Sequence, residues 1–212
     1  MDKLALESIQ AGRNMNRYGL AVLGDIRGPL FRDWIGQGRR VLDIGCRDGA
    51  LTRWYVPHNE VTGVDVDRHA LELAAPMLYH TLWLDVETEW RFLPQSFDVI
   101  VLAEILEHLK NDSLLMAHVA MTLRPGGLCI GSVPNDAGWR GNPPDVDHKR
   151  QYTADTLRQL LEAHLGNVYI APIGVLKGRQ LPVWFMEIVP SLTQGWVFRC
   201  SNTAIIREQN RE

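Results

Sequence analysis

Short runs of apolar residues alternate along the middle of the chain with stretches in which apolar residues recur every three or four positions. The continuous runs are typical of strands buried on both faces, and the spaced stretches predict amphipathic helices. Strands are expected at residues 41–44, 61–65, 81–84, 99–103, 128–133 and 168–173, with a last strand within 195–206. Because strands that alternate with helices form a parallel sheet between helical layers, the pattern predicts an α/β fold.

Helices are expected at residues 50–55, 68–75 and 153–165, and an apolar stripe at helical spacing runs from Leu114 to Met121. Before the first strand, the pattern predicts a short helix within residues 4–10 and a second helix after Gly28 and Pro29. We interpret residues 1–37 as a helical cap or lid over a site, the alternative being a surface cap. Residues 174–212 are expected to hold the C-terminal strands and an apolar insertion. Three interpretations of the insertion stay open: it lines a substrate site, it belongs to the core, or it forms a dimer surface.

Composition places the chain among ordinary globular proteins. With 212 residues, 46% hydrophobic and 22% charged, we expect a single domain over residues 1–212. The net charge of −3 provides no general attraction for nucleic acid. The three cysteines lack the spacing of metal ligands, and no signal peptide or membrane-spanning run is recognised. A cytoplasmic protein without a membrane partner, either monomer or homodimer, is therefore expected.

A glycine-rich turn follows the first predicted strand. Gly45 and Gly49 bracket it, and glycines there let the backbone approach a ligand while free N–H groups attract polar atoms. The next strand ends at Asp65, twenty positions after Gly45. A doubly wound fold places at that point the acid that accepts two ribose hydroxyls. The turn lacks the Gly-x-Gly-x-x-Gly pattern of nicotinamide-dependent dehydrogenases, which disfavours that class.

With these motifs the chain resembles the class I S-adenosylmethionine-dependent methyltransferases. Residues 41–51, 61–65, 97–104 and 123–127 are similar to four motifs of that family, and the resemblance covers residues 38–172. It implies a Rossmann-like doubly wound sheet of about seven strands, mostly parallel with an antiparallel last strand, and helices on both faces. Residues 38–173 would then form the cofactor-binding core. One departure is Arg47, where the family has glycine; arginine does not freely adopt positive φ, and we expect its side chain to point away from the ligand.

The resemblance also implies a set of donor-binding residues at the strand ends. Asp43 would anchor the ammonium group of S-adenosylmethionine, Asp65 its ribose, and Asp85 with the Val86 N–H its adenine. Each aspartate is also typical of a helix or turn cap. The whole predicted set comprises Asp43, Gly45, Cys46, Gly49, Asp65, Val66, Asp85, Val86 and Ala103.

A second group of polar residues follows the fourth predicted strand. If residues 104–108 are helical, Glu104 and His108 share a face with Glu107 beside them. Together with His148, these residues resemble the metal-assisted small-RNA 2′-O-methyltransferases and the ubiquinone-pathway O-methyltransferases. The resemblance implies a divalent metal held by Glu104, Glu107, His108 and His148, which would lower the pKa of an acceptor hydroxyl. Without metal, the segment is expected to shape the floor of the pocket. The catalytic candidates are then His108, His148 and Glu104, and either histidine could act as general base.

The sequence therefore favours an enzyme that transfers a methyl group from S-adenosylmethionine to an oxygen, or a nitrogen, of a small molecule. The acceptor itself is not identified. One alternative is a metal-dependent RNA 2′-O-methyltransferase, and another is a non-catalytic methyltransferase-like binding module, which Arg47 in the glycine turn keeps open. Trp139 and residues 141–144 are expected to form a wall of the acceptor pocket.

Overall fold

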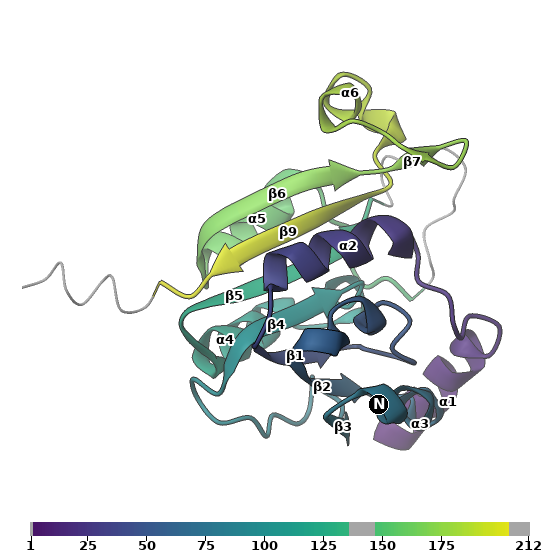
Figure 1. The fold of residues 1–212 in the computed structure, drawn as a ribbon, viewed down its shortest axis with the longest axis vertical. Coiled ribbons are helices and arrows are strands. Elements are labelled where there is room, and N and C mark those ends of the chain that lie inside the picture. The colour runs from purple at the N-terminus through teal and green to yellow at the C-terminus, as the bar shows by residue number, and fades with distance from the viewer. Residues whose placement is uncertain (1, 136–146, 204–212) are drawn as a thin grey trace, which may run out of the picture.

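The computed structural model describes residues 2–135 and 147–203. Within these residues, seven strands form one sheet in the order β3-β2-β1-β4-β5-β9-β6 (Figure 1). Neighbours from β3 to β5 pair in parallel, whereas β9 is antiparallel to both β5 and β6. The predicted fold class is confirmed. The strands are β1 Arg40–Ile44, β2 Glu60–Asp65, β3 His80–Trp83, β4 Phe97–Ala103, β5 Leu123–Pro134, β6 Gly166–Ile173 and β9 Gly195–Ser201.

The central strands are buried on both faces because successive side chains enter two separate cores. In β4, Val99 and Val101 pack in one cluster, and Ile100 and Leu102 pack in the other. Alternation of side chains along a strand sends neighbours to opposite faces, so a continuous apolar run is needed to fill both cores. This explains why strands without polar alternation could be located from the sequence.

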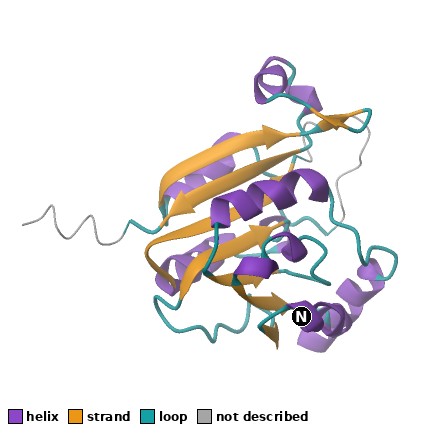
Figure 2. Ribbon diagram, in the orientation of Figure 1, coloured by secondary structure: helices purple, strands orange, loops and turns teal. Residues whose placement is uncertain are grey.

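Helices cover both faces of the sheet (Figure 2). Helix α2, Gly24–Ile35, lies in one layer, where Phe31 joins one core cluster. Helices α4, Asp112–Thr122, and α5, Ala154–Glu162, contribute to the other cluster, and α5 starts at a capping box formed by Thr153. The remaining helices are α1 Lys3–Asn14, α3 Arg68–Ala74 and α6 Val183–Ile188, with 3₁₀ turns η1 Thr52–Trp54, η2 Val56–His58, η3 Ala75–Met77, η4 Leu106–His108 and η5 Pro190–Leu192.

Two predictions for helices were wrong. Helix α2 begins at Gly24, ahead of Pro29, so Pro29 lies inside the helix. At Gly28 the helix packs closely on η1, where a Cβ would lie 2.3 Å from Cδ1 of Trp54. Residues 50–55 form no α-helix and contain η1 instead. The last strand, Gly195–Ser201, lies within its predicted range, of which the part from residue 204 is outside the described residues.

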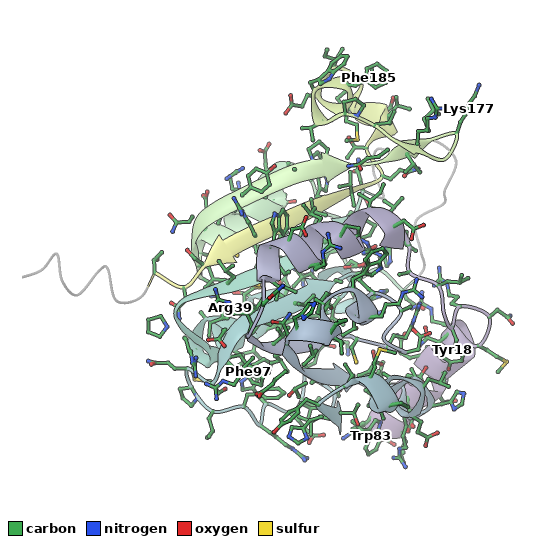
Figure 3. The ribbon with its side chains drawn as sticks, viewed as in Figure 1. Tyr18, Arg39, Trp83, Phe97, Lys177 and Phe185 are labelled. Carbon is green, nitrogen blue, oxygen red and sulfur yellow. The ribbon has the colours of Figure 1, made fainter. Side chains whose placement is uncertain are left out.

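The N-terminal and C-terminal segments differ in how they join the core. Helix α1 lies beside α3 at the edge of the sheet, whereas α2 belongs to a helical layer (Figure 1). Residues 174–194 form the hairpin of β7 Val175–Leu176 and β8 Arg179–Gln180, followed by α6 and η5. The hairpin and α6 extend beyond the end of β6, as the positions of Lys177 and Phe185 show (Figure 3), and α6 packs against that strand. Along the described ranges, no helix has the length and apolar character needed to cross a bilayer.

Candidate active site

A cleft of about 780 Å³ opens at the carboxyl ends of β1, β2 and β4. One part of its wall comes from the glycine turn and the ends of β2 and β3, and another from η4 and His148. The N-terminal segment, including Arg13, Asn14 and Arg27, closes a further side. Apart from Gly49, the residues predicted to bind the donor line the same cleft as those predicted to act on the acceptor. Residues 174–194, predicted as a substrate-site insertion, are not among the described residues that line this cleft.

The glycine turn has the expected backbone. Gly45 and Gly49 have φ of 77° and 76°, and the N–H groups of Gly45 and Cys46 both bond the Val64 carbonyl at 2.8 and 3.1 Å. A Cβ at Gly45 would lie 3.1 Å from Cδ1 of Ile105, so the turn packs directly against the segment after β4. Cys46 is buried, which raises the pKa of its thiol well above the usual value and disfavours a thiolate role.

Arg47 adopts a positive φ of 49°, a conformation that arginine does not freely adopt, and the turn is formed all the same, as expected. Its backbone N–H donates to Oδ2 of Asp65 at 2.9 Å. Its guanidinium bonds Asp48 at 3.0 Å and the carbonyl of Leu20 in the N-terminal segment. These side-chain contacts compensate for a backbone conformation that costs an L-residue about 1–2 kcal/mol.

Asp65 is oriented toward the cleft by backbone donors. Besides Arg47, the N–H of Asp67 donates to its Oδ1 at 2.9 Å. Burial raises the pKa of Asp65 to about 6, opposed by these hydrogen bonds, which favour the ionised form. A half-buried carboxylate held in this way can accept hydroxyl donors from a ligand. Val66, the next predicted residue, lines the cleft beside it.

Asp43 and Asp85 have partners within the protein as well as a place on the cleft wall. Oδ2 of Asp43 accepts bonds from the hydroxyls of Thr52 at 2.6 Å and Tyr55 at 2.7 Å, and burial raises its pKa to about 6. Asp85 caps the turn after β3, accepting from the N–H of Glu87 at 3.0 Å. Val86 and Ala103 also line the cleft. The donor-binding roles of these residues stay predictions.

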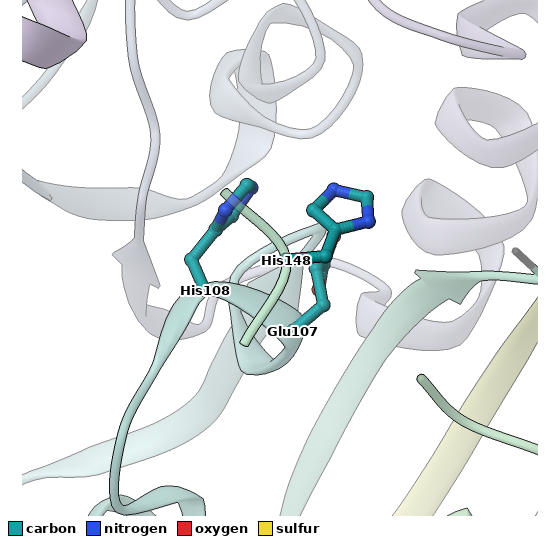
Figure 4. A group of neighbouring side chains, drawn as sticks. All are labelled: Glu107, His108 and His148. Carbon is teal, nitrogen blue, oxygen red and sulfur yellow. The ribbon is translucent and has the colours of Figure 1, made fainter. Parts of the chain in front are cut away.

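The polar cluster is made of Glu107, His108 and His148 (Figure 4). One potential ligand atom from each of these residues lies within 4.8 Å of the others. The two imidazole rings lie 4.9 Å apart between centroids at an angle of 71°. The N–H of Lys149 donates to the Glu107 carbonyl at 2.7 Å, which holds the segment carrying His148 against η4. A carboxylate and two imidazoles at this spacing suit a divalent transition metal or a base that takes a hydroxyl proton.

Glu104, the fourth residue predicted for a metal, lies outside this cluster. The prediction that it shares a helical face with His108 was wrong, because η4 starts at Leu106 and Glu104 itself has a φ of 56°. Its Oε1 instead lies 2.9 Å from Nη1 of Arg27 and accepts a bond from the Ser132 hydroxyl at 2.8 Å.

Arg27 is a cleft residue that the sequence interpretation missed. It is only 3% exposed, and Nη1 also donates to Oγ of Ser132 at 2.7 Å. Its Nε has no hydrogen-bond partner among the described residues. The sequence did contain a signal for Arg27. Arg27, Phe31 and Ile35 recur every four positions, so they share one helix face, and all three are buried. A cation in an otherwise apolar helix face indicates a buried charge with a specific role. Trp139 and residues 141–144, expected to form a pocket wall, lie outside the described residues.

Known proteins resemble this chain in sequence and in fold. Over 119 residues it is 34% identical to a ubiquinone biosynthesis O-methyltransferase of Dechloromonas aromatica, covering 50% of this chain and 51% of that protein. The corresponding protein of Alkalilimnicola ehrlichii is 32% identical over 123 residues, covering 50% and 49%. The chain thus spans about half the length of the curated relatives it matches.

Solved structures share the fold at low sequence identity. A Thermotoga maritima S-adenosylmethionine-dependent methyltransferase, described as a possible histamine N-methyltransferase, superposes with a TM-score of 0.68 at 15% identity, covering 91% of this chain and 98% of that one. An Archaeoglobus fulgidus S-adenosylmethionine-dependent methyltransferase gives 0.63 at 18% identity, covering 84% and 94%. Residues 15–165 match the family described as methyltransferase domain, and the chain belongs to that family.

Proposed function

We propose that this protein transfers a methyl group from S-adenosylmethionine to an oxygen of a small-molecule acceptor. The observation that carries the proposal is the shared cleft: the glycine turn and Asp65 face the same 780 Å³ space as Glu107, His108 and His148. Donor cradle and proton acceptors therefore open onto one volume, as direct transfer between two bound molecules requires. The relatives named as O-methyltransferases in ubiquinone biosynthesis support oxygen as the acceptor atom.

The donor-binding part of the cleft fits an adenosylated amino acid. Asp65 would accept the ribose hydroxyls, and the end of β3 with Asp85 and Val86 would receive the adenine. Arg27 would attract the carboxylate of the amino-acid part through its charge, because it is a cation in the cleft wall.

The polar cluster would prepare the acceptor. His108 or His148 takes the proton of the acceptor hydroxyl, whose oxygen lone pair then forms the new O–C bond. The C–S bond of the donor breaks with its electron pair moving to sulfur, so the sulfonium becomes a neutral thioether. Glu107, His108 and His148 offer one carboxylate and two imidazoles that fit a divalent cation. Such an ion, when bound, lowers the pKa of a ligated hydroxyl.

A binding measurement followed by a transfer assay tests this proposal. Calorimetry with S-adenosylmethionine and S-adenosylhomocysteine should detect both ligands, and absence of binding would favour a non-catalytic module. Transfer of a labelled methyl group would then be measured with catechols and phenols, each with and without Mg²⁺, Mn²⁺ or Co²⁺. A parallel reaction with small RNA separates the alternative, since label appearing in RNA alone would reassign the acceptor.

A further inference from the structure

The segment that carries His148 is fastened to η4 on one side. Besides the Lys149 N–H bond to Glu107, Arg150 donates to the Lys110 carbonyl at 2.6 Å. The same guanidinium lies 2.9 Å from the Asp112 carboxylate at the start of α4. These bonds connect residues 149–150 to the strand-end segment 107–112. They fix the chain that follows His148, but not the residue that precedes it.

The preceding residue is held from the opposite side of the cleft. Nε of Arg13, near the end of α1, lies 2.7 Å from Oδ2 of Asp147. The two side chains are 21% and 30% exposed, so the pair is largely shielded from solvent. Arg13 also lines the cleft itself. An ion pair from the N-terminal segment therefore ends on the residue adjacent to His148.

Helix α1 is at the same time attached to the donor side of the cleft. Nδ2 of Asn14 donates to Oδ2 of Asp67 at 2.8 Å, and this pair is buried. The Tyr18 hydroxyl donates to the same oxygen at 3.1 Å. Asp67 in turn donates its N–H to Asp65. Arg13 and Asn14 are neighbours in sequence, yet one reaches the segment of His148 and the other reaches the loop of Asp65.

We propose that Arg13 is a positioning residue that holds Asp147 and so keeps His148 beside His108, and that α1 couples this contact to occupancy of the donor site. The coupling rests on the proposed function, whereas the contact itself does not. A donor that orders the Asp65–Asp67 loop also orders Asn14 and therefore Arg13. Because such coupling is reciprocal in binding free energy, weakening the Arg13–Asp147 pair reduces the effect of donor on the His148 segment.

Hydrogen exchange of the Lys149 amide reports this contact directly, because that N–H bonds Glu107 and lies two residues from Asp147. Exchange would be measured on the full chain, without ligand and with saturating S-adenosylhomocysteine. In Arg13→Gln, ligand-free exchange should be faster by a factor of about 2 to 5, as expected for loss of one partly exposed ion pair. S-adenosylhomocysteine should slow exchange in the wild type and much less in this variant, whereas Arg13→Lys should restore most of the wild-type response.

Two further variants separate a specific contact from general loosening of α1. Arg68→Gln removes a different ion pair of this helix, in which Nε of Arg68 lies 3.5 Å from Glu7, without changing Arg13 or Asp147, and it should leave Lys149 exchange unchanged. Asp147→Asn should match Arg13→Gln, and the double variant should be no faster than either single one. Thermal unfolding confirms that each variant is folded.

The outcomes divide clearly. If Arg13→Gln exchanges like the wild type, or Arg68→Gln accelerates exchange equally, the positioning role is overturned. If S-adenosylhomocysteine does not bind the wild-type protein, the proposed function fails. The comparison of ligand-free exchange rates still shows whether Arg13 positions the segment of His148. If ligand slows exchange of the Lys149 amide equally in the wild type and in Arg13→Gln, the proposed coupling to the donor site is wrong and only the positioning contact stands.

Discussion

Nη1 of Arg27 lies 2.9 Å from Oε1 of Glu104 and 2.7 Å from Oγ of Ser132, so one buried cation joins α2 to the ends of β4 and β5. Arg27 is nearly inaccessible, whereas the Glu104 side chain is 29% exposed to the cleft. The pair therefore has a protected cation and a carboxylate in contact with the site. This arrangement occupies Glu104 and holds the charge of Arg27 just behind the cleft wall.

Arg27→Gln should weaken both folding and donor binding. The free energy of unfolding should fall by about 1–3 kcal/mol, because Glu104 and Ser132 lose a charged partner in a largely buried place. Affinity for S-adenosylhomocysteine should fall roughly 10- to 100-fold if Arg27 binds its carboxylate. Urea unfolding and calorimetry measure the two effects. Arg32→Gln, on the same helix and in an exposed pair with Asp33, is the matched control; unchanged ligand affinity in Arg27→Gln would place the carboxylate elsewhere.

Donor binding should depend on pH through Asp65. Its pKa is raised to about 6, so this group favours the folded protein below its usual value near 3.8, and that contribution is lost as pH rises through about 6. Binding has the opposite sign, since the ionised form accepts the ribose hydroxyls. Affinity for S-adenosylhomocysteine should therefore fall as pH drops below about 6.

Calorimetry between about pH 5 and pH 8 checks this dependence, and Asp65→Asn should lose about 1–3 kcal/mol of binding at neutral pH together with most of the slope. Any slope that remains in Asp65→Asn reports on Asp43, whose pKa burial also raises to about 6. An affinity independent of pH in the wild type would contradict the ribose contact.

Metal binding should require the three clustered residues and not Glu104. Absorption titration with Co²⁺ should show a bound ion in the wild type that is lost in His148→Ala and in Glu107→Gln, because each removes one ligand from the group. Glu104→Gln and the distant His58→Ala should retain it. If methyl transfer continues in the presence of a chelator, the imidazoles act as bases alone, and a metal role is excluded by that result.

The backbone of the glycine turn predicts a difference between two variants of Arg47. Both Arg47→Gly and Arg47→Ala lose the contacts to Asp48 and Leu20, but only glycine adopts a φ of 49° without strain. Arg47→Gly should therefore be more stable than Arg47→Ala by about 1 kcal/mol, measured by urea unfolding. Equal stabilities would mean that the turn relaxes when the side chain is removed.

Local pattern was sufficient for most of the sheet and for the donor side of the cleft. The strands of a doubly wound sheet are buried on both faces, so their apolar runs are visible one at a time. Asp43, Asp65 and Asp85 follow such runs, and the carboxyl ends of parallel strands meet at one edge, so their common location follows from chain order. The backbone of the glycine turn also agreed with the prediction from its glycines, and only the positive φ of Arg47 is unusual for its residue type.

The sequence by itself thus determined the fold class, the family and the edge of the sheet at which the cleft lies. Tertiary structure alone decided which polar residues meet there. Glu104 was assigned to the histidines by its spacing, yet it pairs with Arg27, while His148 reaches His108 from a separate segment and Arg13 reaches Asp147 across the cleft. Contacts such as Arg27 to Ser132 join residues 105 positions apart. Spacing along the chain predicts which residues are neighbours on one helix or strand. Which residues so far apart in sequence come into contact depends on how the helical layers and strand ends pack together.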